Sequence, residues 1–219
     1  MKMEAFVDLS DLETPVRGTL HRADGTGGDF LVLTHGASGN SNSALLVALA
    51  DAFAQSGLSV LRCDLPYRQR KPNGPPSRSD AKRDQLGLRR AVTLMEQQFT
   101  GRAFLGGSSY GGRQASMLAA SDPEPVAGLL LLSYPLHPPG KPEQLRMQHF
   151  PELRKPVLFV SGTRDTFGTI DELQAAIKLI HGKTKLLEVE GAAHGLTDKK
   201  RQNIVVEAVT SNFWNFFGR

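Results

Sequence analysis

The sequence contains almost no cysteine and no long apolar run. Cys63 is the one cysteine among 219 residues, so no disulfide can form within the chain, and this composition suits a reducing cytoplasm. The longest apolar stretch, residues 126–132, is much shorter than the ~20 residues that a membrane-spanning helix requires. Residues 1–4 include an acid and no apolar segment, which argues against a signal peptide. We therefore expect a cytoplasmic protein with no membrane partner.

A strong excess of charge of one sign is also missing. The formal net charge is +4, and charged residues make up 22% of the chain, as in an ordinary globular protein. So small an excess does not predict nucleic-acid binding, although it favours an anionic substrate. The histidines and the cysteine show no spacing typical of a zinc site. We therefore expect neither a nucleic-acid partner nor a metal.

What the sequence does contain is an alternation of strand-like and helix-like segments. Apolar runs predict strands at residues 30–33, 58–63, 103–105, 126–132 and 157–160, with weaker candidates at 5–9, 16–21 and 185–189. Helical spacing of apolar residues lies between them, at Leu45, Leu49 and Phe53, at Leu88, Val92, Met95 and Phe99, and at Val205, Val209, Phe213 and Phe216. The strand-like runs are continuous, which is typical of strands covered on both faces. This order predicts a single α/β domain over residues 1–219, a three-layer α/β/α sandwich around a mostly parallel sheet of roughly eight strands.

Three local patterns refine this prediction. Residues 66–79 and 134–156 are rich in proline and follow predicted strands, so both lie where they can rim a site at the carboxyl ends of the strands. Neither is long enough for a separate folded unit, so we expect no large cap. Thr169 and Glu172 form a capping-box pattern that predicts the start of a helix, with Gly182 as its stop.

A candidate nucleophile lies where the strand ending at Leu105 meets a glycine-rich turn. Residues 107–111 read Gly-Ser-Ser-Tyr-Gly, the G-x-S-x-G pattern of a serine on a sharp turn between strand and helix. Glycine is needed two residues before and two residues after the serine, because a side chain there would collide with neighbouring segments. A frame centred on Ser109 meets this requirement, whereas a frame centred on Ser108 places Tyr110 at the second position. We therefore predict Ser109 as the nucleophile.

A serine hydroxyl needs a neighbouring base, and the chain has six histidines. His194 follows the last predicted strand, lies among small residues and precedes the final helix. We predict His194 as the base. His137 and His149, in the second proline-rich segment, are the alternatives.

The base in turn needs an acid that holds its ring in the correct tautomer. Asp165 lies just beyond the predicted strand at residues 157–160. The chain order is then serine, aspartate, histidine, as expected with a turn of this kind. We predict Asp165 as the acid, with Asp171 and Glu190 as alternatives.

Acyl transfer also requires two backbone donors that face the developing oxyanion. Residues 31–39 form a strand that runs into a His-Gly turn. We expect the amides of Ala37 and Tyr110 to be these donors. His35 is expected to fix the loop through hydrogen bonds rather than to act in catalysis.

Three further residues are candidates for the substrate pocket, namely Ser38, Tyr67 and Arg68. Arg68 belongs to a basic stretch that also contains Arg70, Lys71 and Arg78. This stretch either receives a carboxylate or phosphate of the substrate or is a solvated loop.

Together, these motifs resemble the α/β-hydrolase superfamily. The resemblance rests on His35-Gly36, residues 107–111, Asp165 and His194, and it extends over nearly the whole chain. Residues 63–68 are similar to those of a group of small lidless predicted hydrolases that is akin in layout to dienelactone hydrolase. Position 109 is serine, whereas dienelactone hydrolase has a nucleophilic cysteine. The resemblance implies a Ser-His-Asp triad, an acyl-enzyme intermediate and no cofactor.

The expected function is that of a serine hydrolase, esterase-like or thioesterase-like, acting on a small acyl substrate. One alternative is a binding or scaffold module that has lost catalysis, although all three triad positions carry chemically competent residues. A second alternative is a small peptidase or amidase. It is less favoured because peptidases of this fold often carry a propeller or cap domain.

Overall fold

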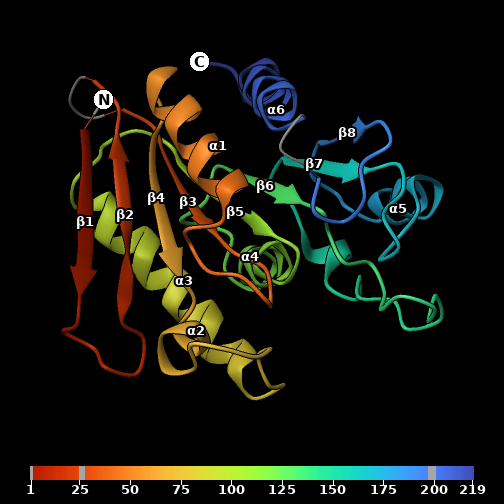
Figure 1. Cartoon of the computed structure of the whole chain (residues 1–219), viewed down its shortest axis with the longest axis horizontal. Helices are drawn as coiled ribbons and strands as arrows, with labels where there is room; N and C mark the ends of the chain where they lie inside the picture. Colours follow the sequence, from red (N-terminus) through yellow and green to blue (C-terminus); the bar gives the residue numbers. More distant parts are fainter. Residues whose placement is uncertain (1, 25–27, 197–200) are drawn as a thin grey trace.

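The computed structural model, which describes residues 2–24, 28–196 and 201–219, is organised around one eight-stranded sheet (Figure 1). The strands are β1 (Lys2–Asp8), β2 (Val16–Arg22), β3 (Phe30–Thr34), β4 (Ser59–Asp64), β5 (Ala103–Ser108), β6 (Gly128–Leu132), β7 (Val157–Gly162) and β8 (Thr184–Val189). Their order across the sheet is β1-β2-β4-β3-β5-β6-β7-β8. β2 is antiparallel to both β1 and β4, and all other neighbours are parallel. This confirms the predicted mostly parallel sheet.

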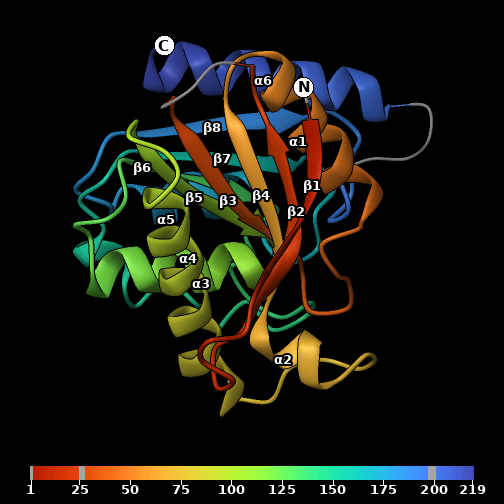
Figure 2. The ribbon, with the colours of Figure 1, turned by 90° about the vertical axis from the view of Figure 1, so that its left-hand side faces the viewer.

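Helices cover both faces of the sheet and complete the predicted three layers (Figure 2). One face carries α1 (Ala44–Gln55) and α6 (Gln202–Phe217), and the other carries α3 (Asp80–Glu96), α4 (Tyr110–Ser121) and α5 (Ile170–Ile177). In β5, Phe104 packs beneath the first pair, whereas Leu105 packs in the core beneath the others. Successive side chains of a strand point to opposite faces. The central strands therefore need apolar residues at every position, which accounts for the continuous runs.

Two proline-rich segments carry short helices that the sequence analysis did not predict. The first contains α2 (Pro66–Arg70), with proline at its first position, and the second contains a 3₁₀ turn at Phe150–Glu152. The second segment is folded on itself, since the Tyr134 hydroxyl donates to the Arg146 carbonyl at 2.6 Å. The amide of His137 also donates to the Phe167 carbonyl at 3.0 Å. Within the described residues these segments form a rim and no large cap.

The start of α5 was predicted correctly, but its end was not. Thr169 and Glu172 make the reciprocal bonds of a capping box, with Thr169 N to Glu172 Oε2 at 2.8 Å and Glu172 N to Thr169 Oγ1 at 3.2 Å. The helix ends at Ile177, five residues before Gly182. Gly182 serves a different purpose, because a Cβ there would lie 2.2 Å from the Lys155 carbonyl oxygen. None of the helices in the described ranges is long and apolar enough to cross a membrane.

The aromatic cluster beneath α6 provides a test of the core. Phe213 is fully buried, and its ring centroid lies 4.9 Å from those of Phe53 and Phe104. Phe213→Ala is expected to lower the free energy of unfolding by about 3–5 kcal/mol, because it leaves a cavity in a close-packed core. Ile204→Ala, on the same helix at a side chain 69% exposed, is expected to change it by about 0.5 kcal/mol or less. Urea denaturation of both variants measures the difference, and equal effects would contradict this packing.

Candidate active site

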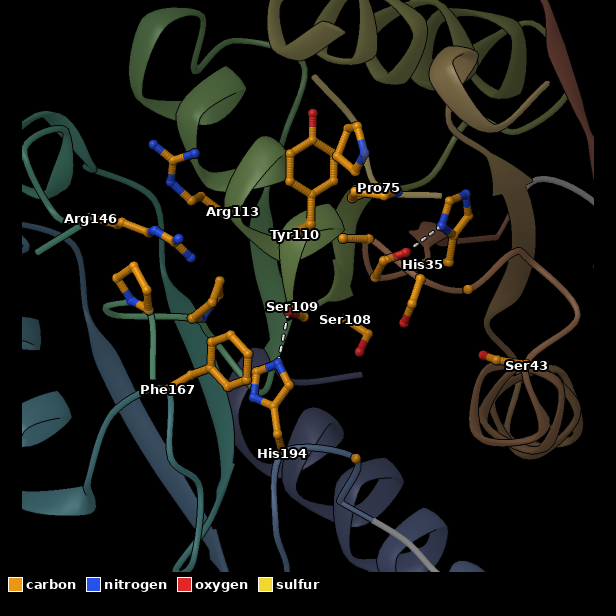
Figure 3. A pocket seen from close by; sticks show the side chains of 18 of the residues that line it. His35, Ser43, Pro75, Ser108, Ser109, Tyr110, Arg113, Arg146, Phe167 and His194 are labelled. Carbon is orange, nitrogen blue, oxygen red and sulfur yellow. Dashed lines mark hydrogen bonds between the residues drawn. The ribbon is translucent and has the colours of Figure 1, made fainter. Parts of the chain in front are cut away.

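The predicted site residues lie at the carboxyl ends of the parallel strands (Figure 3). Ser109 joins β5 to α4, Asp165 follows β7 and His194 follows β8. Ser109, His194 and the loop after β3 line a cavity of about 1100 Å³. Because parallel strands end on the same edge of a sheet, residues far apart in the chain meet there.

The turn at Ser109 holds an unusual backbone conformation, with φ 49° and ψ −116°. The chain can make this turn only if the residues two positions before and two positions after Ser109 carry no side chains. A Cβ at Gly107 would lie 2.7 Å from the carbonyl carbon of Gly111, and one at Gly111 would lie 2.4 Å from the His35 oxygen. A positive φ is strained for any residue with a Cβ, and the Ser109 amide is anchored by a 2.8 Å bond to the Leu132 carbonyl. Glycine is therefore required at positions 107 and 111, because a side chain at either position would collide with neighbouring backbone atoms.

The structure brings Ser109, His194 and Asp165 into one hydrogen-bonded chain. His194 Nε2 lies 2.8 Å from Ser109 Oγ, and Nδ1 lies 2.8 Å and 2.9 Å from the two carboxylate oxygens of Asp165. The Asp165 carboxylate is 1% exposed, whereas the His194 ring is 24% exposed. A carboxylate only accepts, so Nδ1 carries the proton and Nε2 is left to accept from the serine hydroxyl.

The loop that carries Asp165 and the loop that carries His194 are hydrogen-bonded to each other. The amide of Arg164 donates to the Ala192 carbonyl at 2.9 Å, and a Cβ at Gly162 would lie 2.2 Å from the same oxygen. Phe167 contacts both Asp165 and His194. Its amide donates to Asp165 Oδ1 at 2.8 Å, and its ring stacks on the His194 imidazole with centroids 3.9 Å apart. Phe167 thus fixes both the carboxylate and the plane of the imidazole, and no sequence pattern pointed to it.

The loop after β3 is held by the buried His35. The Leu65 amide donates to His35 Nε2 at 3.1 Å, so Nδ1 carries the proton and donates to the Gly36 carbonyl at 2.9 Å. Burial lowers the pKa of His35, which keeps the ring neutral. In a planar trans peptide the N–H points away from the C=O. The bond to the Gly36 oxygen therefore directs the Ala37 N–H away from His35, and Ala37 lines the cavity.

The prediction that Tyr67 and Arg68 line the substrate pocket needs correction, whereas Ser38 does line it. Tyr67 is fully buried and its hydroxyl donates to the Ala37 carbonyl at 2.9 Å. The Arg68 guanidinium donates to the carbonyls of Ala37 at 3.0 Å and Gly39 at 2.8 Å. A guanidinium has only five donors, and these are used to hold backbone carbonyls. Both residues hold the loop after β3 by hydrogen bonds to its carbonyls and do not line the cavity.

The buried carboxylate of Asp84 connects the loop after β3 to the turn at Ser109. Asp84, on α3, is fully buried. Its Oδ1 accepts from the Tyr67 amide at 3.0 Å and its Oδ2 accepts from the Tyr110 hydroxyl at 2.8 Å. Tyr67 holds the Ala37 peptide, and the amide of Tyr110, in the first turn of α4, has no carbonyl partner within the helix. Asp84 therefore ties together the two residues whose amides were predicted to face an oxyanion.

The alternative acids and bases have other surroundings. His137 Nε2 lies 3.3 Å from Glu172, and His149 Nε2 lies 2.8 Å from Ser116 Oγ. Asp171 and Glu190 are exposed, and among the described residues the hydrogen bonds of His194 go to Asp165 and Ser109 instead. Within those same ranges, no group of three or more His, Cys, Asp or Glu side chains is placed to hold a metal ion.

The buried position of Asp84 has a consequence for stability. Burial raises its pKa to about 6, above the value of about 3.9 for an unfolded chain. Between about pH 4 and about pH 6 the folded protein then binds more protons than the unfolded chain, so stability falls as the pH rises. We expect wild type to lose about 2–3 kcal/mol relative to Asp84→Asn across this window. Chemical denaturation of both proteins at a series of pH values measures it.

A control separates this effect from the general loss of a negative charge. Asp171→Asn removes an exposed carboxylate and is measured over the same pH range. A difference between wild type and Asp84→Asn that stays constant from about pH 4 to about pH 6 would show that Asp84 titrates as in an unfolded chain.

Comparisons with known proteins agree with this architecture. A model of the alpha/beta hydrolase domain matches residues 28–216. A 2-hydroxy-6-oxononadienedioate/2-hydroxy-6-oxononatrienedioate hydrolase from Burkholderia vietnamiensis is 35% identical over 131 residues, which cover 58% of this chain and 43% of that protein. The chain thus spans less than half the length of this curated relative.

Solved structures show the same fold at low sequence identity. Est1E from Butyrivibrio proteoclasticus has a TM-score of 0.77 at 18% identity, covering 98% of this chain and 99% of that one. A dienelactone hydrolase from Anabaena variabilis has a TM-score of 0.76 at 20% identity, covering 99% of both chains. The match over residues 28–216, supported by the sheet order and the helical layers, identifies the chain as a member of the alpha/beta hydrolase domain family.

Proposed function

We propose that this protein is a serine hydrolase that cleaves an ester or thioester of a small acyl substrate through an acyl-enzyme. The observation that carries the proposal is the 2.8 Å contact between His194 Nε2 and Ser109 Oγ. The serine stands at the start of a helix, at φ 49°, and faces an open cavity of about 1100 Å³. An activated serine in a cavity is the minimum that nucleophilic acyl transfer needs.

The first half of the reaction forms the acyl-enzyme. Ser109 Oγ attacks the carbonyl carbon while its proton passes to His194 Nε2. Asp165 stabilises the imidazolium that results. The tetrahedral intermediate then collapses, the bond to the leaving group breaks, and His194 returns the proton to the departing alkoxide or thiolate. The second half repeats these steps with water, whose proton His194 accepts, and releases the carboxylic acid and the free serine.

The negative charge that develops on the carbonyl oxygen needs donors already in place. The amides of Ala37 and Tyr110 are proposed to supply them. The support for this role is indirect: His35 and Tyr67 hold the Gly36–Ala37 peptide, and Asp84 holds Tyr110. Loss of one such donor typically costs on the order of 10²- to 10³-fold in kcat.

The comparisons support the reaction class more than the substrate. The Burkholderia vietnamiensis relative is named as a hydrolase of a dienedioate, and another similar structure is described as an alpha-beta serine hydrolase homologue from Coxiella burnetii. The structural likenesses lie below 25% identity and speak for the fold alone. The proposed nucleophile, base and acid therefore rest on the geometry of this chain.

Covalent labelling tests the proposed nucleophile. A fluorophosphonate probe, followed by peptide mass spectrometry, is expected to add mass at Ser109 in wild type and none in Ser109→Ala. His194→Ala is expected to slow both labelling and hydrolysis of 4-nitrophenyl butyrate on the order of 10⁴-fold, because the hydroxyl loses its base.

The control is Ser121→Ala, which removes an exposed serine from the far end of α4 and is expected to label like wild type. Labelling at Ser108 would contradict the choice of serine within the turn. A folded wild type that takes up no probe would instead favour the binding-module alternative, in which the fold has no catalytic role.

A further inference from the structure

Two arginine side chains line the cavity beside the proposed nucleophile. Arg113 lies on α4 and Arg146 lies in the rim segment after β6, and both belong to the cavity wall. Figure 3 shows them on the same side of Ser109, near Phe167 and opposite His35. Two guanidinium groups that share one wall repel each other, so this arrangement requires an explanation.

Two other arginines near the site are neutralised or fully engaged, whereas Arg113 and Arg146 are not. Arg70 pairs with Asp80, and the buried Arg68 donates to five backbone carbonyls. In the described part of the chain, no carboxylate forms an ion pair with Arg113 or Arg146. The Nε atom of Arg113 is buried and has no hydrogen-bond partner. A buried donor without a partner is costly, and a ligand oxygen would satisfy it.

The groups beside Arg113 do not compensate its charge. Burial and the neighbouring Arg113 lower the pKa of His149 to about 4, so this histidine is neutral near pH 7. Burial also raises the pKa of Tyr134, whose hydroxyl donates to the Arg146 carbonyl. Burial, with Arg113 as the second cause, lowers the pKa of Arg146. The lowered pKa values of His149 and Arg146 thus reflect burial first and the nearby Arg113 charge second.

The whole cavity has the same electrostatic character. Its described wall includes a third arginine, the exposed Arg78 in the first rim segment, and contains no Asp or Glu. Asp165 is almost fully buried behind His194. A cleft lined by one sign of charge concentrates ligands of the opposite sign.

Backbone hydrogen bonds fix the positions from which the two arginine side chains extend. Arg113 follows Ser109 by four residues, and its amide donates to the Ser109 carbonyl at 3.0 Å, which places its backbone one helical turn from the serine. Arg146 is held by its amide, which donates to the Leu136 carbonyl at 2.8 Å, and by its carbonyl, which accepts from Tyr134 at 2.6 Å. Both side chains extend from these fixed positions into the wall of the cavity that Ser109 lines.

We propose that Arg113 and Arg146 form a subsite for a carboxylate at the far end of the acyl group, so that the preferred substrates are monoesters or monothioesters of dicarboxylic acids. The two planar guanidinium groups offer paired donors that match a carboxylate. This inference rests on the proposed function for the reaction and on the arginine pair for the specificity.

A matched pair of esters tests the subsite. The probes are mono(4-nitrophenyl) adipate and its neutral counterpart, methyl 4-nitrophenyl adipate, corrected for spontaneous hydrolysis. Wild type is expected to favour the anionic ester in kcat/KM by on the order of 10- to 100-fold, the range for charge-assisted hydrogen bonds. Arg146→Gln and Arg113→Gln are each expected to lower this ratio about 10-fold, mainly through a higher KM for the anionic ester, because bound ground state and transition state both keep the contact.

Two further variants separate charge from geometry. Arg146→Lys keeps the positive charge but loses the paired donors of the planar guanidinium. Its preference for the anionic ester is therefore expected to lie between those of Arg146→Gln and wild type. Arg154→Gln removes an exposed arginine just before the amino end of β7, at the opposite edge of the sheet, and is expected to keep the wild-type ratio. A ratio near one in wild type, or an unchanged ratio in both Gln variants, overturns the subsite while hydrolysis of the neutral ester leaves the proposed function standing.

Binding tests the subsite without any turnover. In the Ser109→Ala variant, adipate is expected to bind in isothermal titration calorimetry and neutral adipamide is not. Adding Arg146→Gln is expected to weaken adipate binding about 10-fold or more. If neither ester is hydrolysed, the proposed function fails, and this measurement alone decides the subsite. Equal binding of adipate and adipamide, or no binding of either, overturns it.

Discussion

The turn that joins β5 to α4 is the constraint around which the site is arranged. Ser109 adopts φ 49° and ψ −116°, a conformation that a chain accepts only where surrounding contacts enforce it. Gly107 and Gly111 let the turn lie against the loop after β3, where a Cβ on Gly111 would come within 2.4 Å of the His35 carbonyl oxygen. This close approach brings the Ser109 hydroxyl, the first amides of α4 and the Ala37 peptide to the same wall of one cavity.

Rigidity around this turn comes from buried polar groups that are paired. His35, Tyr67 and Arg68 all hold carbonyls of the loop after β3. Asp84 accepts hydrogen bonds from both Tyr67 and Tyr110, and so joins the loop after β3 to the turn at Ser109. Stabilisation of a developing charge is strongest where the dipoles do not have to reorganise. The amides proposed at Ala37 and Tyr110 meet this condition, because hydrogen-bonded side chains hold both segments in place. The arrangement requires burial of the Asp84 carboxylate, which raises its pKa to about 6.

The distribution of charge differs between the whole chain and the cavity. The net charge of +4 is small, and several surface arginines face carboxylates, as Arg22 does with Glu4 and Arg102 does with Asp29. Arg113 and Arg146 line the cavity without such partners in the described residues. An uncompensated charge in a partly buried position is unfavourable for folding. Its presence beside the proposed nucleophile is therefore better explained by a ligand than by stability.

By itself, the sequence determined the layered fold, and its local signals predicted the turn at Ser109. Continuous apolar runs predicted the strands because these are covered on both faces, and glycines at 107 and 111 selected Ser109 over Ser108. Only the tertiary structure decided the rest. Tyr67 and Arg68 were expected in the pocket but lie behind the loop. Phe167, Asp84 and the arginine pair carry no local pattern, because their roles arise largely from neighbours distant in the chain, such as Tyr110 for Asp84 and His194 for Phe167. Packing in three dimensions, rather than spacing along the chain, defines them.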